Sequence, residues 1–181
     1  IIKLSKVKKF NKAKIIYCPP YTLLSKFVKK VQKTNIMIGA QNCHYKPDYD
    51  ACTGFISAKM IKDIGSKFVI IGHSEARAEG DSDNKINMKI KIALNSNLKV
   101  IFCIGESFKE KKNKKTNIVL KRQIFNGLKN VKNLKNILIA YEPIWSIGTG
   151  NIPERSRLED QMQKIRKILK YKFKNQNVKI L

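Results

Sequence analysis

Short runs of aliphatic and β-branched residues alternate along the chain with longer segments whose apolar residues recur every three or four positions. The short runs predict buried strands, and the longer segments predict helices with one apolar face. The predicted strands begin at positions 15, 36, 68, 100, 137 and 178. The predicted helices have their apolar stripes within 24–31, 57–64, 86–94, 120–131 and 158–169.

The predicted strands are apolar on both faces and are separated by helices, which indicates a parallel sheet covered by helices. This pattern fits either a doubly wound open sheet or a (β/α)8 barrel. No G-x-G-x-x-G segment follows the first strand, and this argues against a dinucleotide-binding fold. Composition does not break anywhere along the chain, so we expect residues 1–181 to form a single domain.

The chain is strongly basic, with 38 Lys and Arg residues against 13 Asp and Glu and a net charge of +25. Such a charge is typical of nucleic-acid-binding proteins. The basic residues are nevertheless spread along the whole chain, and the densest run, 109–115, contains no aromatic residue that could stack on a base. We therefore interpret the charge as a solvated lysine-rich surface and expect no nucleic-acid partner.

Other features of the composition point to a soluble protein. No apolar run approaches the ~20 residues needed to cross a bilayer, so we expect no membrane segment. The four cysteines lack metal-ligand spacing and favour reduced thiols in a cytoplasmic protein.

Two predicted strands end in residues that could do chemistry, and such ends form the working face of parallel α/β folds. His73 follows Gly72 directly after the strand at 68–71. Free backbone N–H groups beneath its ring would disfavour the protonated form, so a neutral imidazole could donate a hydrogen bond to a substrate oxygen and recover it. A histidine fixed by a backbone carbonyl fits this position equally well.

Glu142 ends the strand at 137–141 and precedes Pro143. A carboxylate beside apolar walls is destabilised in its charged form, and this suits a general base. The alternative is a glutamate paired with a buried Lys or Arg.

The stretch that follows Glu142, residues 143–150, combines a proline, a tryptophan and a Gly-Thr-Gly end, which favours a lid that excludes water. Its Gly148 could offer a backbone N–H to a phosphate.

Taken together, these segments resemble the triosephosphate isomerase family. The base-plus-lid segment is 141–150 (YEPIWSIGTG), and the electrophile segment is 72–75 (GHSE). The end of the family's fifth strand resembles 103–106 (CIGE), and its third loop resembles 39–42 (GAQN) with 53–54 (TG). The order and rough spacing of these segments agree across nearly all of the chain.

The resemblance implies an incomplete (β/α)8 TIM barrel that contains about strands 2 to 6 and the start of strand 7. It implies a homodimeric enzyme of glycolysis and gluconeogenesis that interconverts the triose phosphates dihydroxyacetone phosphate and D-glyceraldehyde 3-phosphate, with no cofactor and no metal. By the same resemblance Glu142 is the base, His73 is the neutral electrophile, and Gly148 binds the substrate phosphate when the lid closes.

Four further roles follow from the resemblance. Glu75 would hold the family's catalytic lysine, and Arg77 would support the loop. Asn42 and Thr53 would lie in the dimer interface, where Thr53 would reach the active site of the partner.

The chain also departs from the family pattern. The family's Asn-x-Lys has no counterpart, because 11–13 (NKA) falls after the place of the first strand, and the Gly-Gly phosphate loop is absent. Ala76 stands where the family usually has Arg, and Phe55 stands where an acidic residue is common. These two changes bear on the geometry of the loops. Because the catalytic lysine and half of the phosphate site are missing, we expect the isolated 181 residues to be close to inactive. The alternative is a catalytically dead relic or an interaction module on the same fold.

Overall fold

The computed structural model describes residues 13–47, 50–174 and 177–181. The Asn11–Lys12 pair, which the sequence places after the family's first strand, lies outside these residues.

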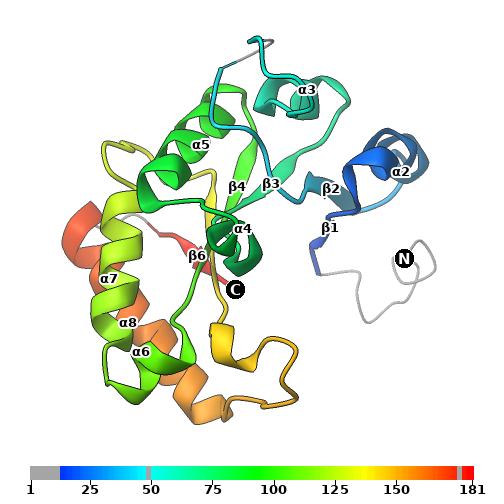
Figure 1. Cartoon of the computed structure of the whole chain (residues 1–181). Helices are drawn as coiled ribbons and strands as arrows, with labels where there is room; N and C mark the ends of the chain where they lie inside the picture. Colours follow the sequence, from blue (N-terminus) through cyan, green and yellow to red (C-terminus); the bar gives the residue numbers. More distant parts are fainter. Residues whose placement is uncertain (1–12, 48–49, 175–176) are drawn as a thin grey trace.

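Within the described residues six strands form one parallel sheet, and their order in the sheet is their order in the chain. They are β1 (Ile15–Tyr17), β2 (Ile36–Ala40), β3 (Phe68–Ile71), β4 (Lys99–Ile104), β5 (Ile137–Tyr141) and β6 (Lys179–Ile180). A doubly wound sheet would reverse its strand order at a switch point, and no such reversal occurs here. The sheet curls into a half-barrel, which confirms the barrel-type alternative (Figure 1).

The predicted helices are present with some changes at their ends. They are α2 (Leu24–Val31), α3 (Ala58–Asp63), α5 (Asp83–Asn95), α7 (Thr116–Gly127) and α8 (Arg155–Phe173). The prediction that the helix at 120–131 continues to position 131 is wrong. Helix α7 ends at Gly127, and the backbone turns at Asn130, whose φ is 61°. Leu128 and Val131 are buried all the same, so their spacing reflects packing after the helix rather than a longer helix.

Short elements that the sequence analysis did not predict lie beside the strand ends. They are α4 (Ser74–Ala78), α6 (Phe108–Lys112) and two 3-10 turns, η2 (Tyr21–Leu23) and η3 (Ile144–Ser146). These segments connect the carboxyl ends of the strands to the long helices, so they line the face where the candidate residues lie.

The two faces of the sheet bury different sets of residues. In β4, Phe102 belongs to the large core beneath the helices, whereas Ile101 and Cys103 join a small cluster on the opposite face. Helices α5, α7 and α8 lie outside the curve of the sheet (Figure 1). In the described part of the chain, no helix combines the length and the apolar character that a membrane span requires.

Candidate active site

The ends of β3 and β5 bring the two leading candidates together. His73 Nε2 lies 3.5 Å from Glu142 Oε2, and the two side chains are 29% and 37% exposed. Strand β4 lies between the strands that carry them. The sequence analysis expected both residues at this edge of the sheet, and the structure adds that they face each other.

The His73 ring is oriented by the backbone of the helix that follows it. His73 is the N-cap of α4, and its Nδ1 accepts a hydrogen bond from the backbone N–H of Glu75 at 3.4 Å. Because Nδ1 accepts, the neutral ring carries its proton on Nε2, the atom that faces Glu142. The ring is therefore held through a backbone N–H group rather than a backbone carbonyl.

One oxygen of the Glu142 carboxylate faces His73. Its Oε2 is buried and accepts no hydrogen bond from the described residues. Burial, and then the nearby Glu142 charge, raise the pKa of the Cys103 thiol to about 12, so Cys103 stays protonated beside it. Among the described residues Glu142 faces the imidazole of His73 and forms no ion pair with a Lys or Arg, which argues against a structural pair with a buried cation.

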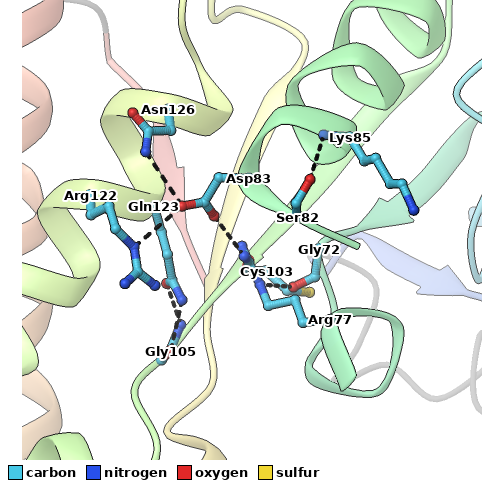
Figure 2. Close-up of polar contacts among 10 residues, drawn as sticks. All are labelled: Gly72, Arg77, Ser82, Asp83, Lys85, Cys103, Gly105, Arg122, Gln123 and Asn126. Carbon is cyan, nitrogen blue, oxygen red and sulfur yellow. Dashed lines mark hydrogen bonds and ion pairs between the residues drawn. The ribbon is translucent and has the colours of Figure 1, made fainter. Parts of the chain in front are cut away.

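Arg77 ties the end of β3 to the end of β4. Its Nε donates to the carbonyl of Gly72 at 2.8 Å, and its Nη2 donates to the carbonyl of Cys103 at 3.3 Å (Figure 2). Asp83 holds the guanidinium through a 2.9 Å contact with Nη1, and Arg122 approaches the same carboxylate at 3.3 Å. Glu75, in contrast, is exposed, and its carboxylate lies 3.6 Å from His73 Nδ1.

The start of the segment 143–150, which the sequence analysis predicted to be a lid, is anchored by a buried carboxylate to which that analysis gave no role. Trp145 Nε1 donates to Glu106 Oε1 at 2.9 Å, and the Tyr141 hydroxyl donates to Glu106 Oε2 at 3.1 Å. Lys111 Nζ lies 3.0 Å from the centre of the Trp145 ring. Burial, and then the Glu106 charge, raise the pKa of Tyr141. The sequence signal for Glu106 was a charged residue two positions after the end of the apolar strand β4.

The end of the segment 143–150 is open to solvent. Gly148 is exposed with a φ of 69°, and a side chain added there would have no atom within 4 Å. Thr149 Oγ1 donates to the carbonyl of Trp145 at 3.1 Å, which links the tip back to the anchored start. The structure thus places Gly148 in a segment that stands away from the neighbouring side chains.

Asn42 and Thr53 lie in a second region. Both line a hollow of about 810 Å³, together with Ala76 and other residues. Asn42 Oδ1 accepts a hydrogen bond from Lys89 Nζ at 3.1 Å. Lys89 Nζ also lies 2.5 Å from Asp81 Oδ2, and the two charged side chains are only 6% and 12% exposed. Neither Asn42 nor Thr53 belongs to the His73–Glu142 pair.

All four cysteines are free thiols. Within residues 13–47, 50–174 and 177–181, no group of three His, Cys, Asp or Glu side chains is placed to hold a metal ion.

A curled parallel sheet with facing ionisable residues at the carboxyl ends of its strands defines a protein of the (β/α)8-barrel class, in which this edge carries the active site. The family model for triosephosphate isomerase matches residues 2–181. The chain belongs to the triosephosphate isomerase family.

Individual relatives agree with this assignment. The chain is 40% identical over 166 residues to a triosephosphate isomerase of Alkaliphilus oremlandii, covering 90% of this chain and 66% of the relative. It is 43% identical over 160 residues to that of Saccharomyces cerevisiae, covering 88% and 64%. A crystal structure of triosephosphate isomerase from Bartonella henselae superposes with a TM-score of 0.84 at 34% identity, covering 92% of this chain and 68% of that one. The chain thus spans just under two thirds of the length of the first two relatives.

Proposed function

We propose that the protein is a triose-phosphate isomerase (EC 5.3.1.1) that interconverts dihydroxyacetone phosphate and D-glyceraldehyde 3-phosphate. The observation that carries this proposal is the 3.5 Å approach of His73 Nε2 to Glu142 Oε2 at the carboxyl ends of β3 and β5. We place the reaction in glycolysis and gluconeogenesis in the cytoplasm.

In the proposed reaction Glu142 is the general base. Its Oε2, which accepts no hydrogen bond from the described residues, takes a proton from C1 of dihydroxyacetone phosphate, while the Nε2–H of His73 donates a hydrogen bond to the C2 carbonyl oxygen. The donated hydrogen bond stabilises the negative charge that develops on this oxygen in the enediolate. Glu142 then returns the proton to C2, and His73 moves a proton between the two oxygens. Substrate and product are isomers, so no oxidant, reductant or cofactor is required.

The other candidate residues have supporting roles in this proposal. The backbone N–H of Gly148 binds the phosphate when the lid closes. Glu75 is exposed and can hold a catalytic lysine, while the hydrogen bonds of Arg77 fix the ends of β3 and β4.

We also propose a homodimer in which Asn42 and Thr53 meet the partner. The contact of Asn42 with the buried Lys89 and the exposure of Thr53 support a preformed surface for docking. The continuous sheet supports one domain that includes residues 13–181 as far as they are described.

Replacing His73 with glutamine in the complete gene product should lower kcat by about 100-fold, because the glutamine amide polarises the carbonyl less well and cannot shuttle a proton. A coupled assay that follows consumption of glyceraldehyde 3-phosphate measures this loss. His44→Gln, at the other of the two histidines, is the matched control and should keep the wild-type kcat. Equal kcat values for His73→Gln and wild type would contradict the role given to His73.

The isolated 181-residue chain should turn over little or no substrate in the same assay. Among the described residues β1 and β6 each pair with a strand on one side only, so the outer edges keep unpaired backbone groups. An eight-stranded barrel also cannot close with six strands. Size-exclusion chromatography should show association of the isolated chain. Turnover equal to that of the complete gene product would overturn this expectation.

A further inference from the structure

Gln123 in α7 makes a paired contact with the backbone of a single residue. Its Nε2 donates to the carbonyl of Gly105 at 3.0 Å, and its Oε1 accepts the N–H of Gly105 at 3.0 Å (Figure 2). The side chain is 3% exposed. Gly105 follows the last residue of β4, where the pairing with β5 ends at Ile104 and Tyr141. Gln123 thus binds the backbone groups of Gly105 just where the strand ladder stops.

The same face of α7 is packed tightly against β4. Gly127 follows Gln123 by four residues and so lies above it on one side of the helix. A side chain added at Gly127 would come within 2.4 Å of the Phe102 ring. Helix α7 therefore contacts β4 and its end at two positions one turn apart, Gln123 and Gly127. This packing leaves Gln123 little freedom to move away from Gly105.

Gly105 in turn is in contact with the backbone of Glu142. A side chain added at Gly105 would lie 1.8 Å from the carbonyl oxygen of Glu142, so only a glycine permits this approach. The N–H of Glu142 donates to the carbonyl of Ile104 at 2.9 Å. The position of the β4 end therefore sets the position of the Glu142 backbone, and with it the direction of the carboxylate.

We propose that Gln123 is a positioning residue for Glu142, acting through Gly105. The proposal rests on the proposed function, in which Glu142 is the base. Gln123 does not touch the substrate. It holds the end of β4, against which Glu142 is packed, so that the carboxylate stays within reach of the reacting carbons and of His73.

The test uses Gln123→Met in the complete gene product, which keeps the side-chain volume and removes both hydrogen bonds. A displacement of the base should lower kcat about tenfold to 100-fold, because misplacement by about 1 Å can have an effect of that size. KM should change less than kcat, since Gln123 itself contacts no group that is assigned to the phosphate. Where Gln123→Met does not fold, Gln123→Glu carries the test, because its carboxylate still accepts from Gly105 N–H but repels the carbonyl.

Asn87 supplies a matched control. It is also a buried amide, 8% exposed, and its Nδ2 donates to the carbonyls of Gly127 and Lys129 at 2.8 and 2.9 Å. Asn87→Leu should lower the free energy of unfolding as Gln123→Met does, yet lower kcat much less, because it leaves both hydrogen bonds between Gln123 and Gly105 in place. If both variants lower kcat equally, Gln123 is only a structural residue and the inference is overturned.

A double variant separates this inference from the proposed function. If Gln123 acts through Glu142, then Gln123→Met should have no further effect on kcat once Glu142 is already glutamine. Additive losses in Glu142→Gln/Gln123→Met would contradict the inference while leaving Glu142 as the base. Full activity in Glu142→Gln alone would instead contradict the proposed function.

Discussion

Replacement of Glu142 with glutamine in the complete gene product should lower kcat by about 100-fold to 10,000-fold, the usual contribution of a general base. Glutamine has nearly the shape of glutamate but cannot accept the proton from C1. KM should stay near the wild-type value, because a group that acts only in the transition state affects kcat rather than binding. Steady-state kinetics with dihydroxyacetone phosphate measure both constants.

The structure offers a control for the loss of one carboxylate. Glu159 lies on α8, where it forms an exposed ion pair with Arg155 at 2.8 Å. Glu159→Gln removes the same charge and should retain the wild-type kcat. Glu142→Asp keeps a carboxylate but withdraws it by one methylene group, so its kcat should fall between wild type and Glu142→Gln. A kcat for Glu142→Gln that matches Glu159→Gln would rule out Glu142 as the base.

The largest effect on stability is expected from Lys89→Met, which should lower the free energy of unfolding by about 3–5 kcal/mol. The Lys89 side chain is 6% exposed and lies 2.5 Å from Asp81 Oδ2. Its removal leaves a buried carboxylate without its cation and also removes the hydrogen bond to Asn42. Urea unfolding at a fixed protein concentration measures the change.

Two further variants test whether the buried Lys89–Asp81 pair causes the lower free energy of unfolding of Lys89→Met. Lys85→Met removes an exposed lysine from the same helix and should change the free energy of unfolding by no more than about 0.5 kcal/mol. Asp81→Asn combined with Lys89→Met removes both charges, so it should recover much of the stability that Lys89→Met loses. A Lys89→Met variant as stable as Lys85→Met would show that the buried pair contributes nothing.

The strands could be predicted from the sequence because they lie in short apolar runs, and the central strands β2 to β5 bury residues on both faces. The short helices were missed because five residues cannot show an apolar stripe. A signal for α6 was nevertheless present. Ser107 and Glu110 form a capping box, in which each side chain bonds the backbone of the other residue, and Ser-x-x-Glu is readable in a sequence.

The sequence was sufficient to predict at which edge of the sheet the candidate site lies, but not the contacts within the site. The sequence places His73 and Glu142 after two strands, and parallel strands end on the same side. It does not show that Trp145 bonds Glu106, because these residues are 39 positions apart and their contact depends on how η3 folds over β4. Gln123 was equally hidden, since a polar residue within a helix ordinarily faces solvent, whereas here it is buried on Gly105.

The most direct test of the central claim is to run the isomerisation in D₂O and analyse the glyceraldehyde 3-phosphate by NMR. A proton that passes through the Glu142 carboxylate can exchange with solvent, so the account predicts deuterium at C2 in at least part of the product. The Glu142→Gln variant should form almost no product under the same conditions. Product from the wild-type protein with no deuterium at C2 would indicate a direct hydride shift between carbons, and it would contradict the role of Glu142 as the base.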